Sequence, residues 1–99
     1  MIGFLYCGSE YGKLISSFPL FQVNNVGTYI VKPTVEYTAE ELSFVMETNF
    51  GSGYQMCQLS HPLLKASRVG SIVFISSTAG VVAVDVGTPY AATKGDFNL

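Results

Sequence analysis

The 99-residue sequence contains no tryptophan, and only 12% of its residues are charged. Five basic residues against seven acidic ones form no basic stripe to meet phosphates, which argues against a nucleic-acid-binding protein. No apolar stretch approaches the roughly 20 residues of a membrane-spanning helix, and residues 1–7 lack the basic leader of a signal peptide. We therefore expect a soluble, cytoplasmic protein with neither a nucleic-acid nor a membrane partner.

Cysteine and glycine motifs are also scarce. Cys7 and Cys57 have none of the spacings of a zinc site or a disulfide framework, so no metal site is expected. Gly8 and Gly12 have the wrong spacing for a dinucleotide-binding turn, and Gly51-Ser52-Gly53 does not follow a predicted strand. The glycine-rich turn that receives a pyrophosphate at a helix N-terminus in doubly wound folds is therefore not found.

The most informative stretch is residues 70–99. The run Ser71–Ser76 is apolar and rich in β-branched residues, which predicts a strand buried on both faces of a parallel sheet. Because such sheets place their chemistry beyond the carboxyl ends of the strands, Ser77 is a candidate functional residue. Thr88 and Pro89 predict a helix start, with Thr88 as the cap and Pro89 at the first helical position.

Tyr90 and Lys94 are four positions apart and share one face of that predicted helix. With Ser77, they bring a hydroxyl, a phenol and an ammonium within reach of one small site. Each has an ordinary interpretation when taken alone. A serine that ends a strand usually bonds nearby backbone, and a Tyr/Lys pair at helical spacing is usually a solvated face.

The middle of the chain predicts a strand, a turn and a long helix. Pro19 cannot donate to a sheet ladder, so the strand is short, at about Leu20–Val23, and the turn Asn24-Asn25-Val26-Gly27 follows it. Thr38-Ala39-Glu40-Glu41 is a capping box that begins a helix running from Ala39 to about Leu64.

Two features of this helix depend on its interior residues. Gly51-Ser52-Gly53 predicts a bend near Asn49, and Pro62 predicts a kink in the last turns. One face carries a stripe at helical spacing, formed by Phe50, Tyr54, Cys57, His61 and Leu64.

Taken together, these motifs resemble the short-chain dehydrogenase/reductase family, and the sequence is most similar to its plant tropinone reductase-like branch. The resemblance rests on Tyr-x-x-x-Lys, on Ser77 thirteen positions before Tyr90, on Asn49 in Met-Glu-Thr-Asn-Phe, and on the turn at 24–27, where Val26 replaces the usual Ala. The stretches 32–40 and 61–65 also look like that branch.

The resemblance covers roughly residues 24–99 and implies an α/β fold, the middle portion of a partial Rossmann-like doubly wound parallel sheet. We expect residues 1–99 to form a single incomplete domain of this family, with a divergent segment at 1–21 and a family-like core fragment at 22–99.

The resemblance also implies roles for individual residues. Tyr90 would be the acid/base, and Lys94 would favour its phenolate and bond the nicotinamide ribose. Ser77 would orient the carbonyl oxygen of a small-molecule substrate, and Asn49 would hold a water in the proton relay. The implied cofactor is NADP(H), and the residues implied to bind it are Asn24, Asn25, Gly27, Tyr90 and Lys94.

The parental reaction would be an NADP(H)-dependent interconversion of a ketone and a secondary alcohol. The family's domain is much longer than this chain, so we expect the fragment, without the cofactor-binding and C-terminal parts, to be inactive alone. Its bare strand edges and uncovered apolar faces predict marginal stability. Two alternatives stay open: an interaction module that pairs with full-length relatives in a homo- or hetero-oligomer, and a non-functional truncated product.

Overall fold

The structure, a computed structural model, describes residues 20–96 of the chain. Cys7, Gly8, Gly12 and all of the divergent segment except Leu20 and Phe21 lie outside these residues. In chain order the elements are β1 (Leu20–Asn24), the 3-10 turn η2 (Thr34–Glu36), α1 (Ala39–Met46), the π-helical turn η3 (Glu47–Gly51), α2 (Ser52–Ser67), β2 (Gly70–Phe74), the 3-10 turn η4 (Thr78–Gly80) and α3 (Thr88–Gly95).

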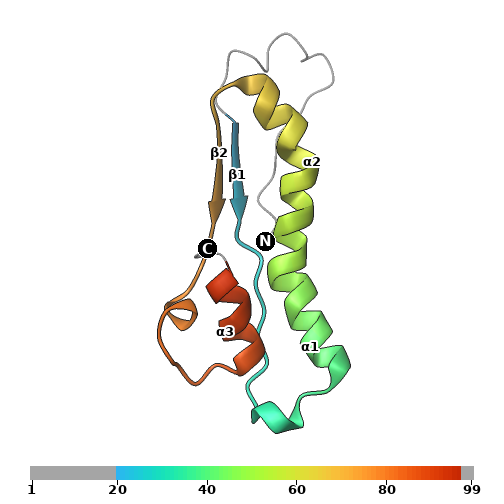
Figure 1. Ribbon diagram of the computed structural model, residues 1–99, viewed down its shortest axis with the longest axis vertical. Coiled ribbons are helices and arrows are strands. Elements are labelled where there is room, and N and C mark those ends of the chain that lie inside the picture. Colours follow the sequence, from blue (N-terminus) through green and yellow to red (C-terminus); the bar gives the residue numbers. More distant parts are fainter. Residues whose placement is uncertain (1–19, 97–99) are drawn as a thin grey trace.

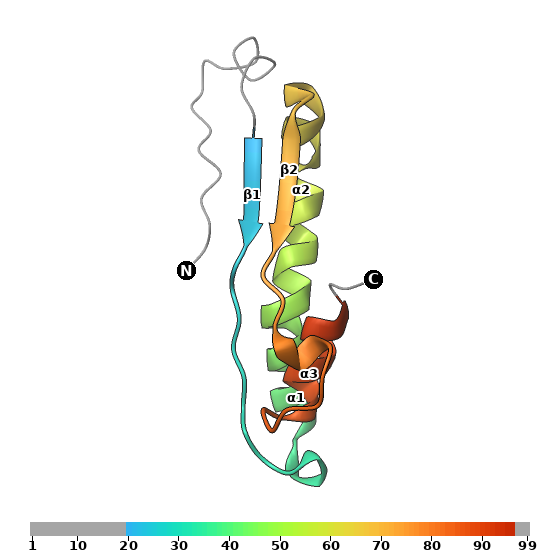
Figure 2. The same ribbon diagram turned by 90° about the vertical axis from the view of Figure 1, so that its left-hand side faces the viewer.

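The two strands form a parallel pair with the long helix between them in the sequence. Leu20 lies opposite Gly70, and Asn24 lies opposite Phe74. The continuous helix α1–η3–α2 runs along one side of the pair, and α3 lies beyond the carboxyl ends of the strands (Figures 1 and 2). This strand–helix–strand unit is the repeating element of a doubly wound α/β sheet, so the predicted fold class is confirmed.

The long helix begins at the predicted capping box. The Glu41 backbone N–H donates to Thr38 Oγ1 at 3.2 Å, and the Thr38 N–H donates to Glu41 Oε2 at 2.9 Å. These two bonds satisfy donors that the first turn of a helix leaves without intrahelical partners.

A π-helical turn lies at the position of the predicted bend. The Ser52 N–H bonds the carbonyl of Glu47, five residues earlier, and Ser52 Oγ donates to Thr48 O at 2.6 Å. Such a turn adds one residue to the helix, and the buried Asn49 lies at its centre. The helix then continues through Pro62 to Ser67, three residues past the predicted end.

The predicted stripe is not the buried face of this helix. Tyr54 is 56% exposed and His61 is exposed, whereas the buried positions are Val45, Asn49, Gly53, Ser60 and Ser67. Small residues face the strands because the backbones approach closely: a Cβ on Gly53 would lie 3.0 Å from the Phe74 ring. The packed face of the helix is therefore set by the close approach of the strands and does not coincide with the stripe.

The prediction that β2 is buried on both faces is wrong. Four of its five residues are exposed, and only Phe74 is partly buried. Within residues 20–96 the sheet has only two strands, with the long helix along one side. The buried hydrophobic side chains of this part are Val45 and Ala79, while six buried residues are polar or charged: Gln22, Asn49, Ser60, Ser67, Thr93 and Lys94.

The start of α3 differs by one residue from the prediction. Gly87, with φ 88°, precedes the helix as its cap, and Thr88 is the first helical residue. Thr88 Oγ1 instead forms a hydrogen bond of 2.6 Å with Thr34 Oγ1, which draws the segment after β1 against α3. Glycine suits the cap because its positive φ is strained for other residues and a Cβ there would meet the Ile30 carbonyl.

In the part of the chain that the structure describes, no helix combines the length and apolar character needed to cross a membrane.

Glu41 gives the fold a measurable pH dependence. The hydrogen bond from Lys32 Nζ, 2.5 Å from Glu41 Oε2, and the bond from the Thr38 N–H lower the pKa of Glu41 below its usual 4.5. Because the folded-state pKa is the lower one, this carboxylate stabilises the fold above the unfolded-state pKa. That stabilisation is lost as the pH falls through the folded-state pKa.

We therefore expect the urea midpoint to fall more between pH 7 and pH 3 in the wild type than in Glu41→Gln, which can keep the capping box. Glu40→Gln, one position earlier on the exposed first turn, is the control and should keep the wild-type pH dependence. Equal pH dependence in Glu41→Gln and the wild type would contradict the assignment.

Candidate active site

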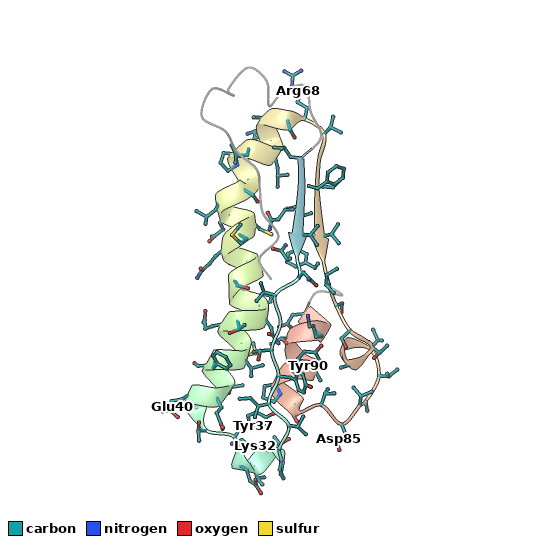
Figure 3. All side chains as sticks on the ribbon, turned by 180° about the vertical axis from the view of Figure 1, so that it is seen from behind. Lys32, Tyr37, Glu40, Arg68, Asp85 and Tyr90 are labelled. Carbon is teal, nitrogen blue, oxygen red and sulfur yellow. The ribbon has the colours of Figure 1, made fainter. Side chains whose placement is uncertain are left out.

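The candidate site lies where α3 and the π-helical turn meet the segments that leave β1 and β2. Figure 1 shows α3 beside these segments, and Figure 3 labels Tyr90 on it. The carboxyl ends of parallel strands are where doubly wound folds gather functional side chains. The contacts below show which of the predicted residues come together there.

Lys94 is 5% exposed, although it carries an ammonium. Its Nζ donates to the Ile75 carbonyl at 2.7 Å and lies 5.7 Å from the centroid of the Tyr90 ring. A hydrogen bond to a carbonyl and a position near an aromatic ring both compensate an ammonium for lost water. The charge is thereby held just beyond β2, beside Tyr90.

Tyr90 is partly buried and contacts two groups of the site. Besides Lys94, it meets the Tyr29 ring edge-on, with the ring centroids 5.8 Å apart and the planes at 62°. This edge-to-face arrangement is the one that ring quadrupoles favour. Tyr29 follows the turn at 24–27, so the segment after β1 helps to orient Tyr90.

Asn49 is 3% exposed, and its amide joins two other elements. Its Oδ1 accepts from the Thr28 N–H at 2.7 Å, and its Nδ2 donates to Thr28 O at 2.8 Å and to Thr93 Oγ1 at 3.0 Å. Thr93 lies between Tyr90 and Lys94 on α3. Asn49 is therefore bound to the helix that carries both residues.

Ser77 is attached to the site through its neighbours. Its Oγ accepts from the Ala79 N–H at 3.2 Å and caps η4. Ser76 Oγ donates to the Lys94 carbonyl at 2.9 Å, and Ile75 O receives the Lys94 ammonium. The residues that precede Ser77 thus fix this segment to α3, while the Ser77 hydroxyl keeps a proton to donate.

The turn after β1 lies against the same group. A Cβ on Gly27 would be 3.5 Å from Lys94 Nζ and 3.9 Å from Asn49 Oδ1. Asn24 Oδ1 accepts from Gln22 Nε2 at 2.8 Å, whereas its buried Nδ2 has no hydrogen-bond partner among the described residues. The side chain of Asn25 is exposed.

A cavity of about 790 Å³ opens beside the start of α3. Residues 31–34 and 79–85 line it, together with Gly87, Thr88 and Ala91. Thr88 and Ala91 are the residues immediately before and after Pro89-Tyr90 in the sequence. Four valines give it apolar walls: Val31, Val81, Val82 and Val84. Lys32 and Asp85 are its charged residues and lie at the same end of the molecule in Figure 3.

Three residues of this site were not predicted from the sequence. Thr93 and Tyr29 contact predicted residues directly, and Gly80 packs against the Lys94 carbonyl, which a Cβ at that position would approach to 2.5 Å. The sequence feature that could have indicated Thr93 is its small hydroxyl side chain one helical turn after Tyr90. Nothing local marked Tyr29 or Gly80.

Comparison with known proteins identifies the family of this chain. The family model described as short chain dehydrogenase matches residues 18–98. The chain belongs to the short-chain dehydrogenase family. This confirms the resemblance on which the sequence prediction relied.

Relatives within the family include plant proteins. Senescence-associated protein 13 of Arabidopsis thaliana is 67% identical over 76 residues, which is 77% of this chain and 28% of that protein. Tropinone reductase homolog At2g29290 from the same plant is 64% identical over 76 residues, or 77% of this chain and 29% of that protein. The chain thus spans less than a third of the length of these relatives.

Solved structures of other proteins share the fold. A gluconate 5-dehydrogenase from Burkholderia cenocepacia, in complex with NADP and tartrate, superposes with a TM-score of 0.73 at 27% identity, over 78% of this chain and 30% of that one. A 3-oxoacyl-[acyl-carrier protein] reductase from Brucella melitensis with bound NAD gives 0.74 at 28% identity, over 78% and 32%.

Proposed function

We propose that this chain forms the proton-transferring side of a short-chain dehydrogenase site that interconverts a ketone and a secondary alcohol with NADP(H). The observation that carries the proposal is the buried Lys94 ammonium beside Tyr90, at the carboxyl end of a parallel strand. A buried charge costs free energy unless it is bonded, so its place next to a phenol indicates more than a solvated face.

The residues present fit a nicotinamide cofactor at the turn after β1. Any side chain at Gly27 would lie over the Lys94 ammonium, and glycine leaves this approach open. Gly27, Tyr90 and Lys94 would hold the ribose, with Asn24 and Asn25 flanking them. When bound, the cofactor supplies or accepts the hydride. The two solved structures hold NADP and NAD respectively, and our choice of NADP(H) follows the resemblance to the tropinone reductase-like branch.

Three side chains of this chain would handle the substrate oxygen. In reduction, the Tyr90 hydroxyl gives its proton to the carbonyl oxygen, and in oxidation the phenolate takes the proton back. Lys94 stabilises the phenolate through its positive charge. Ser77 donates a hydrogen bond to the same oxygen, oriented by the bond that its Oγ accepts from Ala79.

Asn49 has one hydrogen-bonding position left for a relay water. Both hydrogens of its Nδ2 are donated, to Thr28 O and Thr93 Oγ1, and one lone pair of Oδ1 accepts from the Thr28 N–H. Only the second lone pair of Oδ1, on the side of Gly27, is left for a relay water.

The carbonyl substrate would enter from the cavity beside α3. Its four valine walls favour an apolar body on the substrate, with the carbonyl at Tyr90. The cytoplasmic location expected from the sequence stays a prediction.

The test is the rate of ketone-dependent NADPH oxidation by the full chain and two variants. We expect Tyr90→Phe to lower any turnover by about 10²- to 10⁴-fold, because the phenylalanine has no proton to transfer. Tyr54→Phe, which removes the hydroxyl of an exposed tyrosine on α2, should leave the rate unchanged. A measurable wild-type rate that Tyr90→Phe retains in full would contradict the acid/base role.

A second candidate is an interaction module that pairs with full-length relatives. It is favoured by large hydrophobic side chains exposed along the long helix: Leu42, Phe44, Tyr54 and Leu59, at 45%, 54%, 56% and 71% exposure. A wild type without turnover that co-purifies with a full-length relative would favour this candidate. Exclusive self-association would count against it.

A further inference from the structure

Thr93 is a polar residue with no solvent contact. Its relative exposure is 0%, the same as that of the hydrophobic Val45. Its hydroxyl donates to the Tyr90 carbonyl at 2.8 Å and accepts from Asn49 Nδ2 at 3.0 Å. Thr93 therefore donates its one hydroxyl proton within α3, and its oxygen accepts a hydrogen bond from the Asn49 amide of the π-helical turn.

The same amide extends the connection to the segment after β1. Asn49 exchanges two hydrogen bonds with the backbone of Thr28, at 2.7 and 2.8 Å. A continuous path of hydrogen bonds therefore runs from the Thr28 backbone through Asn49 and Thr93 to the backbone of Tyr90. It joins three separate parts of the chain, and two of its members, Asn49 and Thr93, are buried.

We propose that Thr93 is a positioning residue, which sets the rotation of α3 so that Tyr90 and Lys94 face the site together. The proposal rests on the proposed function for its consequence in catalysis, but its structural content can be tested without activity. Each residue of an α-helix is turned by about 100° from the one before it, so the side chains of α3 have fixed directions relative to one another. A small rotation of the whole helix would therefore move Tyr90 and Lys94 together. Lys94 is fixed at its tip by Ile75 O, and Thr93 fixes the adjacent position to Asn49.

A space-filling role for Thr93 makes a different prediction. Valine has nearly the same shape as threonine but lacks the hydroxyl, so a residue that only fills space would tolerate Thr93→Val. A positioning residue would not, because the Asn49 Nδ2 hydrogen would lose its buried acceptor. Thr93→Ser keeps the hydroxyl and should restore the connection.

The experiment is amide hydrogen exchange and the NMR spectrum of the full chain in the wild type, Thr93→Val and Thr93→Ser. We expect Thr93→Val to speed exchange of the Thr28 amide, which donates to Asn49 Oδ1, by at least about tenfold. We also expect it to shift the ring resonances of Tyr90. Thr93→Ser should keep both values near those of the wild type.

Wild-type exchange and Tyr90 resonances in Thr93→Val would overturn the proposal, whatever the enzymatic activity. If Thr93→Val does not fold, Thr93→Ala against Thr93→Ser gives the same comparison, since those two variants differ only by the hydroxyl. Where turnover is measurable, Thr93→Val should lower kcat more than it changes KM, and Thr93→Ser should recover kcat. A wild type without turnover would remove the proposed function but leave the exchange result decisive for Thr93.

Discussion

Gly80→Ala is expected to lower the free energy of unfolding by about 3 kcal/mol, the upper part of the usual range for overpacking. A Cβ at Gly80 would lie 2.5 Å from the Lys94 carbonyl oxygen, 2.6 Å from its carbon and 2.9 Å from the Gly95 nitrogen. All three are backbone atoms, so no side-chain rotation can relieve the overlap. The end of α3 would have to move away from η4, which would strain the bond from Ser76 Oγ to Lys94 O.

The matched control for this variant is Gly95→Ala, on the other side of the same contact. A Cβ there would lie 3.6 Å from the Gly80 carbonyl oxygen, an ordinary van der Waals distance. Because alanine favours a helix over glycine by up to about 1 kcal/mol, this variant should be neutral or slightly stabilised. Urea unfolding followed by circular dichroism measures both, and equal midpoints for Gly80→Ala and the wild type would refute the close contact.

Asn49→Leu is expected to cost at least about 3 kcal/mol of unfolding free energy. Leucine has the same number and branching of side-chain heavy atoms as asparagine. It leaves three hydrogen-bonding groups without the partner they have now: the Thr28 N–H, the Thr28 carbonyl and the Thr93 hydroxyl. Each buried group left unpaired costs about 1–3 kcal/mol, and water can reach the least buried of them.

Gln55→Leu is the control for Asn49→Leu. It makes the same change from an amide to leucine at an exposed position on α2. We expect its unfolding free energy to stay within about 0.5 kcal/mol of the wild-type value. An Asn49→Leu variant as stable as Gln55→Leu would mean that the amide does not join the three elements.

Features that depend on neighbouring residues could be predicted from the sequence. The capping box at Thr38 and Glu41 was found because its partners are three positions apart. Two nearby glycines marked the helix near Asn49, where the structure has a π-helical turn. The helix start at Thr88 and the four-residue spacing placed Tyr90 and Lys94 on one helix for the same reason. Local chemistry sufficed in each case.

Features that depend on distant partners could not be predicted in this way. Thr88 was taken for a cap because its hydroxyl partner, Thr34, is 54 positions away. Thr93 was missed because its contact with Asn49 joins positions 44 apart. The packed face of α2 could not be identified either, because closeness to Phe74 selects Gly53 at that face.

The parallel pairing of β1 and β2 has a consequence for the order in which the chain folds. Leu20 pairs with Gly70, so the first strand contact must close a loop of fifty residues. Closing such a loop costs conformational entropy before any long-range contact forms, whereas helix turns form from nearby residues within about a microsecond. We therefore expect the helix from Ala39 to Ser67 to form early and the strand pair late. The Tyr90–Lys94 site, built beyond the strand ends, would then be among the last parts of the chain to assemble.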